Sequence, residues 1–392
     1  MFSQTLAISL LNLKSIPQRW APSLVIVIGL AGVVAVFVAL LAMAQGFAST
    51  LAETGRTDNA LVLRGGSGAE LNSGFGRDAG DLIRLGPGIR QGADGAPLVS
   101  GELIAITELF KKGEQRNGAN VTLRGVEPSG FELRPQLKII EGRRFTPGLN
   151  EIIAGVGVAR QFDGVGVGDE LRLRGSQWTV VGVFESGDAN DSELWTDIGT
   201  AQSAFNRSGY SSMRVGLISP QALAELSAAF DADPRLTVEA LEERAYYSGQ
   251  TRQFRSMIGA LAGIVTLIMG LGAIFAALNT MYAAVAARTR EIATLRAIGF
   301  SGFPVLVSVM IEAIILALIG GLIGALLAWL LFNNLTVSTL GQNFTQVVFA
   351  FKVNGALVLG GLVIALVIGL VGGLLPAISA ARLPVTTALR TQ

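Results

Sequence analysis

The sequence of 392 residues contains no cysteine and no histidine. Their absence excludes disulfides, thiol nucleophiles, zinc sites of the usual type and every catalytic triad that uses histidine. Charged residues are also scarce, at 15% of the chain, whereas soluble proteins have about 25%. Since 51% of the residues are hydrophobic and the mean hydropathy is +0.53, the composition predicts an integral membrane protein.

The apolar residues form four long runs that are almost free of charge. Leu24–Met43 is wholly uncharged and, at about 1.5 Å per residue, long enough to cross a hydrocarbon layer of about 30 Å. A cleaved signal peptide is the alternative, because Lys14 and Arg19 precede this run. A signal peptide has a shorter apolar core of about 7–15 residues, which favours a retained anchor. The three later runs contain one charged residue, Glu312, and we predict transmembrane helices over residues 23–46, 255–287, 303–332 and 353–381.

The basic residues predict how these helices are oriented. Lysine and arginine without excess acid occur in residues 1–22, in the 288–302 loop and in the 382–392 tail. By the positive-inside rule these three segments face the cytoplasm, so the long 47–254 segment and the short 333–352 loop lie outside. We therefore expect a multi-pass protein of the bacterial inner (cytoplasmic) membrane with both termini in the cytoplasm. Within residues 1–22, apolar residues at near-helical spacing predict an amphipathic helix on the cytoplasmic face, the alternative being an irregular start to the first span.

The extracytoplasmic segment 47–254 has a different pattern. Short alternating runs predict strands and two other stretches predict helices, which together indicate an α+β domain; the strands are Ala60–Arg64, Val121–Val126, Glu170–Arg174 and Gln177–Phe184, and the helices 201–206 and 220–230. Its glycine-rich runs lack the spacing and the lysine of a P-loop and are predicted to be turns. The segment is mildly acidic, so we expect no nucleic-acid partner. No P-loop occurs anywhere in the chain, so we assign it no nucleotide hydrolysis and no catalytic or metal-binding residue.

Glycines and polar residues inside the predicted spans are candidates for helix packing. Glycine pairs at four-residue spacing let helices approach closely in lipid and predict an assembled bundle, within or between subunits; the pairs are Gly259 with Gly263, Gly320 with Gly324, and Gly369 with Gly373. Glu312 is an ionisable residue inside a span, and such residues are functional candidates. The alternative is that Glu312 only fixes packing by hydrogen bonding to Asn279 or Thr280 of the second span.

The cytoplasmic loop after the second span combines charge with an apolar stripe. Arg288 and Glu291 are three residues apart and can pair on one helical face. An apolar stripe suited to a protein groove would lie on the same helix, which we expect to continue the second span, and Gly299 would end it; the stripe consists of Ile292, Leu295 and Ile298. The alternative is an ordinary positive-inside loop.

The stretch Ala287–Phe300 resembles the signature E-R-T-R-E-I-x-x-L-R-A-[LI]-G of the MacB/FtsX-like permeases, with Ala287 in place of the leading glutamate. This group, the type VII ABC transporter family, includes the Lol lipoprotein-releasing and DevC-type permeases. The similarity extends over essentially the whole chain; further matches are Ile311-Glu312-Ala313, Gly320–Gly324, Pro376–Arg382, Pro384-Val385, Ala388–Arg390, Glu141–Arg143, Gly168-Asp169 and Val181–Phe184. The resemblance implies four transmembrane α-helices plus a MacB periplasmic-core-like α+β domain inserted between helices 1 and 2.

The resemblance also implies partners and a role for the loop. A separate ABC ATPase subunit dimer would use ATP and Mg, with no cofactor bound by this chain itself and no fused ATPase domain. The implied coupling residues are Arg288, Arg290, Glu291, Ile292, Leu295, Arg296 and Gly299. A second permease copy would complete the complex, by default as a homodimer with a heterodimer as the alternative, and a periplasmic adaptor or carrier protein would be an optional further partner.

Two functions remain open at this stage. The first is a permease that exports or extrudes a lipid, lipoprotein, peptide or drug. The second is an FtsX-like subunit that mechanically controls an extracytoplasmic hydrolase or sensor. A membrane-anchored enzyme is disfavoured, because the sequence shows no nucleophile–base pair or metal-binding constellation.

Overall fold

The computed structural model describes residues 20–114, 118–341 and 345–383. The chain divides into two compact units. We call them the helical unit, which comprises residues 1–45, 255–335 and 351–392, and the sheet unit, which comprises residues 46–254 and 336–350. The amphipathic helix predicted for residues 1–22 falls almost entirely outside the described residues, as does most of the predicted tail.

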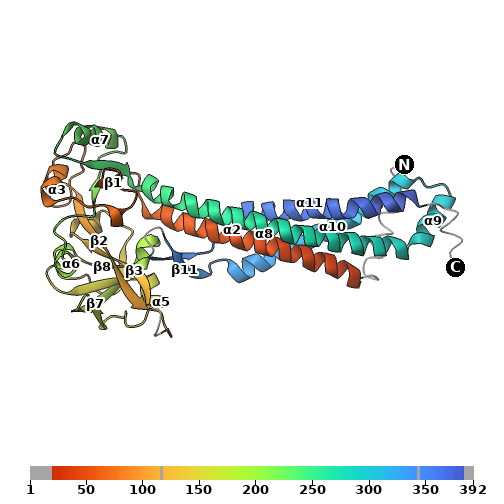
Figure 1. Cartoon of the computed structure of the whole chain (residues 1–392), viewed down its shortest axis with the longest axis horizontal. Coiled ribbons are helices and arrows are strands. Elements are labelled where there is room, and N and C mark those ends of the chain that lie inside the picture. Colours follow the sequence, from red (N-terminus) through yellow and green to blue (C-terminus); the bar gives the residue numbers. More distant parts are fainter. Residues whose placement is uncertain (1–19, 115–117, 342–344, 384–392) are drawn as a thin grey trace. The chain divides into compact units, whose positions relative to one another are not determined.

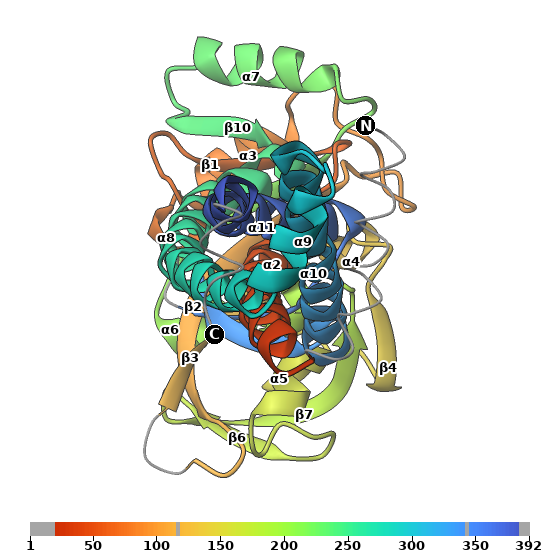
Figure 2. The ribbon, with the colours of Figure 1, turned by 90° about the vertical axis from the view of Figure 1, so that its right-hand side faces the viewer.

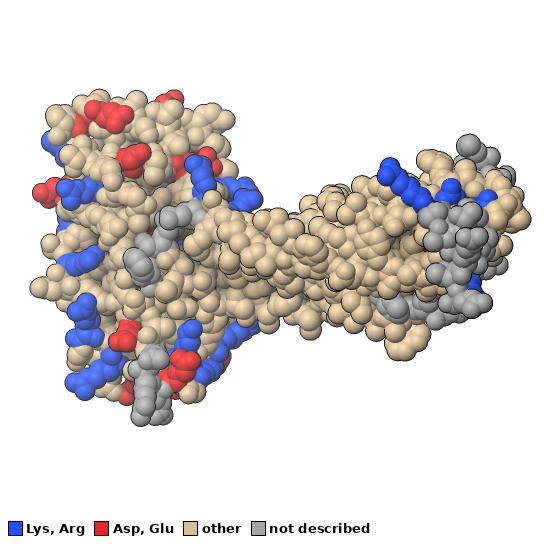
Figure 3. Space-filling model, turned by 45° about the vertical axis from the view of Figure 1, so that its right-hand side comes forward, with Lys and Arg blue, Asp and Glu red and all other residues tan. Residues whose placement is uncertain are grey.

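Long apolar helices make up the helical unit. Four of its helices are long and apolar enough to cross a membrane, and they run side by side (Figures 1 and 2); they are α2 (Trp20–Thr54), α8 (Glu243–Ala287), α10 (Gly302–Phe332) and α11 (Gly355–Arg382). No charged side chain shows along the middle of these helices (Figure 3). The four predicted spans are confirmed. Helices α2 and α8 are longer than predicted, because hydropathy marks the length in contact with lipid and not the point where backbone hydrogen bonding stops.

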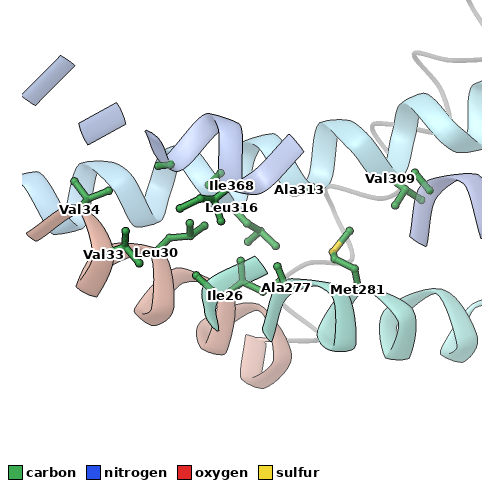
Figure 4. Packing of buried hydrophobic residues seen from close by; sticks show 14 of the residues in the cluster. Ile26, Leu30, Val33, Val34, Ala277, Met281, Val309, Ala313, Leu316 and Ile368 are labelled. Carbon is green, nitrogen blue, oxygen red and sulfur yellow. The ribbon is translucent and has the colours of Figure 1, made fainter. Parts of the chain in front are cut away.

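Helices α2 and α10 pack through small residues. A Cβ atom on Gly320 would lie 2.9 Å from the Cβ of Leu30, and one on Gly324 would collide with the backbone of Ala31. Both glycines therefore allow the two helices to approach more closely than any larger residue would. Around this contact, side chains from α2, α8, α10 and α11 form one buried apolar cluster (Figure 4), which includes Ile26, Leu30, Val34, Ala277, Met281, Val309, Ala313, Leu316 and Ile368.

The other two glycine pairs differ from each other. A Cβ on Gly369 or Gly373 would collide with the side chains of Ala317 or Ala313, so this pair brings α11 against α10. A Cβ on Gly259 or Gly263 would meet no described atom within 4 Å. This last pair therefore packs against nothing in the described part of the chain, and its predicted packing role remains open only for contacts with another subunit.

The sheet unit is built on one ten-stranded sheet with the strand order β10-β1-β9-β2-β3-β8-β5-β7-β4, in which β6 pairs with β7. The β3–β8 and β5–β7 pairs are parallel, and the other pairs are antiparallel. The strands are β1 (Asn59–Arg64), β2 (Val99–Phe110), β3 (Gly118–Val126), β4 (Lys138–Gly142), β5 (Glu151–Gly155), β6 (Glu170–Leu173), β7 (Ser176–Glu185), β8 (Glu193–Asp197), β9 (Ser212–Gly216) and β10 (Val238–Glu242).

Short helices cover the sheet. They are η2 (Glu70–Asn72), α3 (Arg77–Arg84), α4 (Ser129–Glu132), α5 (Val156–Gln161), η3 (Ala189–Ser192), α6 (Ile198–Phe205) and α7 (Ala222–Ala232). Helices α3 and α7 contribute Ile83, Leu226 and Phe230 to an apolar cluster with β1, β9 and β10. Helices α5 and α6 belong to a second cluster over β2, β3 and β5–β8. The predicted α+β class and all the predicted strands and helices of this domain are confirmed, and Gly66, Gly164 and Gly168 have the positive φ angles expected in turns.

The predicted 333–352 loop forms a hairpin of β11 (Thr336–Leu340) and β12 (Gln346–Ala350), which belongs to the sheet unit. The Val348 N–H donates to Ser192 Oγ at 2.8 Å, and the ring of Phe349 lies 5.5 Å from that of Phe47, edge to face. The β-branched residues of both strands are the local signal for this hairpin. The short connection predicted between the third and fourth spans thus contains a hairpin, which was not predicted from the sequence.

Candidate functional site

Helix α9 (Thr289–Ala297), which follows α8, carries most of the predicted coupling residues. The predicted continuous helix is wrong, because Arg288 lies between α8 and α9 with φ −105° and ψ 8°. The Arg288 N–H donates to the carbonyl of Val285, which tightens the last turn of α8. At the other end, Gly299 has a φ of +102° and Phe300 N–H donates to the carbonyl of Leu295. This is a Schellman-type ending, so the predicted stop at Gly299 is present.

Arg288 forms a buried ion pair with Glu312 of α10. The Arg288 Nη1 and Glu312 Oε2 atoms are 3.4 Å apart, and the two side chains are only 9% and 6% exposed. The sequence suggested Glu291 as the partner of Arg288, but Glu291 is exposed. Arg288 follows the buried residues Met281 and Val285 at helical spacing and faces the bundle with them, whereas Glu291 is exposed although it lines the same cavity as Arg288.

The alternative partners suggested for Glu312 are engaged elsewhere or turned away. Thr280 Oγ1 donates to the carbonyl of Ala276 in its own helix. Asn279 lies on the exposed side of α8. The carboxylate inside the third span is therefore paired with a cation from the 288–302 loop, as a charge within a bundle requires.

The two faces of α9 differ in chemistry. Ile292 is buried, and it lines a cavity of about 30 Å³ together with Arg288, Glu291, Leu295, Val305 and Glu312, so Glu291 lies at the border between the buried and the exposed side of α9. Arg290, Glu291 and Ile298 are exposed. The expectation of an apolar stripe facing a partner is thus wrong for Ile292, which packs inside its own chain. The exposed residues of α9 are Arg290, Glu291, Thr294 and Ala297. Glu291 in the first turn and Arg296 in the last are in the favourable order for the helix dipole.

A second contact holds the far end of α9. The Arg296 Nη1 atom donates to the carbonyl of Leu383, just after α11, at 2.5 Å. Helix α9 is therefore fastened to α10 by the Arg288–Glu312 ion pair and to the end of α11 by Arg296. The sequence analysis missed both contacts. An available signal for the first was that an acid inside a span needs a basic partner, and Arg288 lies at the end of the preceding span.

The described part of the chain shows no cluster of side chains that would bind a metal ion. Within residues 20–114, 118–341 and 345–383, no group of three or more aspartate, glutamate, histidine or cysteine residues could hold a metal ion.

Comparison with known proteins identifies the two parts of the chain. Residues 23–233 match the sequence model of the MacB-like periplasmic core domain, and residues 263–385 match that of the FtsX-like permease C-terminal region. The uncharacterized ABC transporter permease YknZ of Bacillus subtilis (strain 168) is 26% identical over 327 residues, which cover 76% of this chain and 77% of the relative.

Two solved structures are similar to about half of this chain. The extracellular domain of YknZ from Gram-positive bacteria matches with a TM-score of 0.35 and 16% identity, covering 47% of this chain and 99% of that one. The periplasmic region of MacB from Actinobacillus actinomycetemcomitans matches with a TM-score of 0.36 and 14% identity, covering 50% and 92%. Because the periplasmic core model alone spans more than half of the sequence, the chain belongs to the MacB/FtsX-like family of ABC transporter permeases.

Proposed function

We propose that this chain is the permease subunit of an ATP-driven transporter in which an ABC ATPase subunit binds the exposed face of α9. The family implies a partnership with such an ATPase, which would bind the ATP and Mg. The observation that carries the proposal is the arrangement of α9: its outer face presents Arg290 and Glu291, while Arg288 and Arg296 fasten it to two transmembrane helices. A protein bound to this face would act on both helices together.

The coupling would run from α9 through the bundle to the sheet unit. A displacement of α9 would pass to α10 through the Arg288–Glu312 pair and to α11 through the carbonyl of Leu383. Helices α2 and α8 each contain residues of both units, so the chain itself connects the bundle to the extracytoplasmic domain. ATP hydrolysis would thereby move the sheet unit without a passage for substrate through the middle of the bundle.

The remaining parts of the proposal concern location and cargo. We place the chain in the bacterial inner membrane with both termini in the cytoplasm, because Arg288, Arg290, Arg296 and Arg382 lie at one end of the spans. A second permease copy would complete the complex. Export or extrusion of a lipid, lipoprotein, peptide or drug is the proposed outcome, and mechanical control of an extracytoplasmic hydrolase or sensor would use the same coupling.

Charge reversal at Glu291 tests the coupling. Glu291→Lys should leave the protein folded and inserted, because the side chain is exposed, but it should abolish the stimulation of the partner ATPase by the permease, together with transport. The matched control is Glu225→Lys, which reverses an exposed glutamate in the first turn of α7, in the sheet unit. Both changes carry the same helix-dipole cost of about 0.3–1 kcal/mol. Normal ATPase stimulation and transport by the Glu291→Lys complex would show that the loop is only a topology signal.

A further inference from the structure

One face of the sheet carries a group of charged residues that are buried inside the sheet unit. Successive residues of a strand point to opposite faces. In β2, β3, β8 and β9, one set of alternate residues therefore joins the apolar clusters, and the other set carries charge. The charged residues of this second set are Glu102, Arg124, Glu193 and Arg214. Glu193 is partly exposed, and the other three are buried.

These residues pair with one another and with neighbours from outside the sheet. Arg124 contacts Glu70 at 2.9 Å, Glu102 at 2.6 Å and Glu193 at 2.7 Å, and Arg134 contacts Glu102 at 2.8 Å. We call the group formed by Glu70, Glu102, Arg124, Arg134, Glu193, Arg214 and Glu243 the ionic cluster. Burial alone would raise the pKa of Glu102, but the charges of Arg134, Arg214 and Arg124 outweigh burial and hold that pKa well below its ordinary value.

The first residue of α8 is the point where the ionic cluster meets the transmembrane helices. Glu243 is fully buried, and its Oε1 atom lies 2.7 Å from Arg214 Nη2 of β9. Its Oε2 atom accepts hydrogen bonds from the backbone N–H of Arg56 at 3.1 Å and from Asn59 Nδ2 of β1 at 3.0 Å. One carboxylate thus joins the start of α8, the segment just after α2 and the neighbouring strands β1 and β9.

Two further contacts strengthen this junction. The Tyr247 hydroxyl accepts a hydrogen bond from Arg214 Nη2 at 3.2 Å and donates one to Glu70 Oε2 at 3.3 Å, so α8 is connected to the ionic cluster a second time. Gly55, which follows α2, lies so close to α8 that a Cβ atom would be 2.5 Å from the Cα of Arg244. The end of α2 and the start of α8 therefore touch at a point where only glycine fits.

Stability alone does not account for this arrangement. Removing paired charges from water costs nearly as much as their attraction returns, and well-packed apolar side chains stabilise an interior at least as well. What ion pairs and hydrogen bonds add is a fixed geometry between the groups that they join. We infer that Glu243, Arg214 and Tyr247 are positioning residues that fasten the ends of α2 and α8 to the sheet, so that the extracytoplasmic domain follows these helices when they move. This inference rests on the proposed function.

Hydrogen–deuterium exchange on the full chain in complex with its ATPase, with and without a non-hydrolysable ATP analogue, tests the inference. In the wild type, we expect nucleotide to change the exchange of α9 and also that of β1 and β9. Glu243→Gln keeps the size of the side chain but removes its charge, and it should retain the nucleotide response at α9 while losing the response in the two strands. Tyr247→Phe is a second variant that removes only the hydroxyl, and it should show the same separation.

The control is Glu127→Gln, which removes a carboxylate from the Arg84–Glu127 pair of the same unit, at 2.7 Å, without touching α2 or α8. This variant should keep the nucleotide response in both places. If Glu243→Gln also keeps the response in β1 and β9, or changes it no more than Glu127→Gln does, the inference is wrong. If the wild type itself shows no nucleotide response at α9, the proposed function fails, and the inference falls with it.

Discussion

Replacing Glu312 by leucine should destabilise the helical unit strongly, because Arg288 would lose its ion-pair partner in a buried position. At the observed 3.4 Å, two charges attract each other by about 5 kcal/mol for an effective dielectric constant of about 20. Desolvation offsets much of this attraction, so the intact pair contributes little net stability. Removing one partner leaves the desolvation of the other less well compensated, and we expect Glu312→Leu to cost up to about 3–5 kcal/mol. Glu312→Gln keeps an acceptor for Arg288 and should cost less.

A double-mutant cycle separates this effect from general packing damage. The double variant Arg288→Leu with Glu312→Leu removes both charges and should be more stable than either single leucine variant. The free energy of unfolding would be measured in mixed micelles by titration with a denaturing detergent. Losses that simply add in the double variant would refute the argument that the two side chains act as a pair. ATPase stimulation should remain impaired in the double variant even where stability returns, since α9 would no longer be fastened to α10.

Three other predictions follow from separate features of the two units. Gly324→Ala should cost about 1–3 kcal/mol, because its Cβ would collide with the backbone of α2; Gly263→Ala, in open space, should leave the stability of the single chain unchanged in the same unfolding assay, and equal losses would contradict the packing. Burial raises the pKa of Asp191 from 3.8 to about 6, so its protonated form favours folding. That stability is present below about pH 4 and lost as the pH rises through about 6; thermal melts of Asp191→Asn should depend less on pH in this window than those of the wild type. Cysteine introduced at Ser67 should be labelled from outside the cell and cysteine at Ser301 only after permeabilisation, and external labelling at Ser301 would overturn the proposed orientation.

The elements predicted from the sequence are those determined by short-range patterns. The uncharged run Leu24–Met43 lies within α2, and the alternating residues Gln177–Phe184 lie within β7, because hydropathy and a period of two are readable over a few neighbours. The lengths predicted for the long helices were less accurate than their positions. Helix α8 begins twelve residues before the predicted 255, at Glu243, because its first turns are stabilised by contacts in the sheet unit and not by lipid.

The features that the sequence did not predict depend on pairs of residues far apart in the chain. Arg288 and Glu312 are 24 residues apart in the chain, and α9 and the first turns of α10 lie between them. The ionic cluster was missed for a similar reason. Arg124 and Arg214 alternate with apolar residues, a pattern that normally marks a strand with one face in water, and here the outer face is covered by α8 and η2.

Helix α8 has charged contacts at its two ends, and Ala273, Ala277 and Met281 between them pack into the buried apolar cluster of the helical unit. Among the four long helices, α8 is the least enclosed. Of its most apolar stretch of 18 residues, 22% is buried, whereas the corresponding share is 33–39% in the other three helices. Its middle carries Gly259 and Gly263, which touch no described atom of the chain. Its first residue is held by Arg214, and the residue after its last is held by Glu312. A helix with charge-paired anchors at both ends passes an axial displacement from one anchor to the other through its own hydrogen bonds. Under the proposed function, substitutions at either anchor should therefore uncouple ATP hydrolysis from the extracytoplasmic domain more severely than substitutions of equal size in the middle of α8.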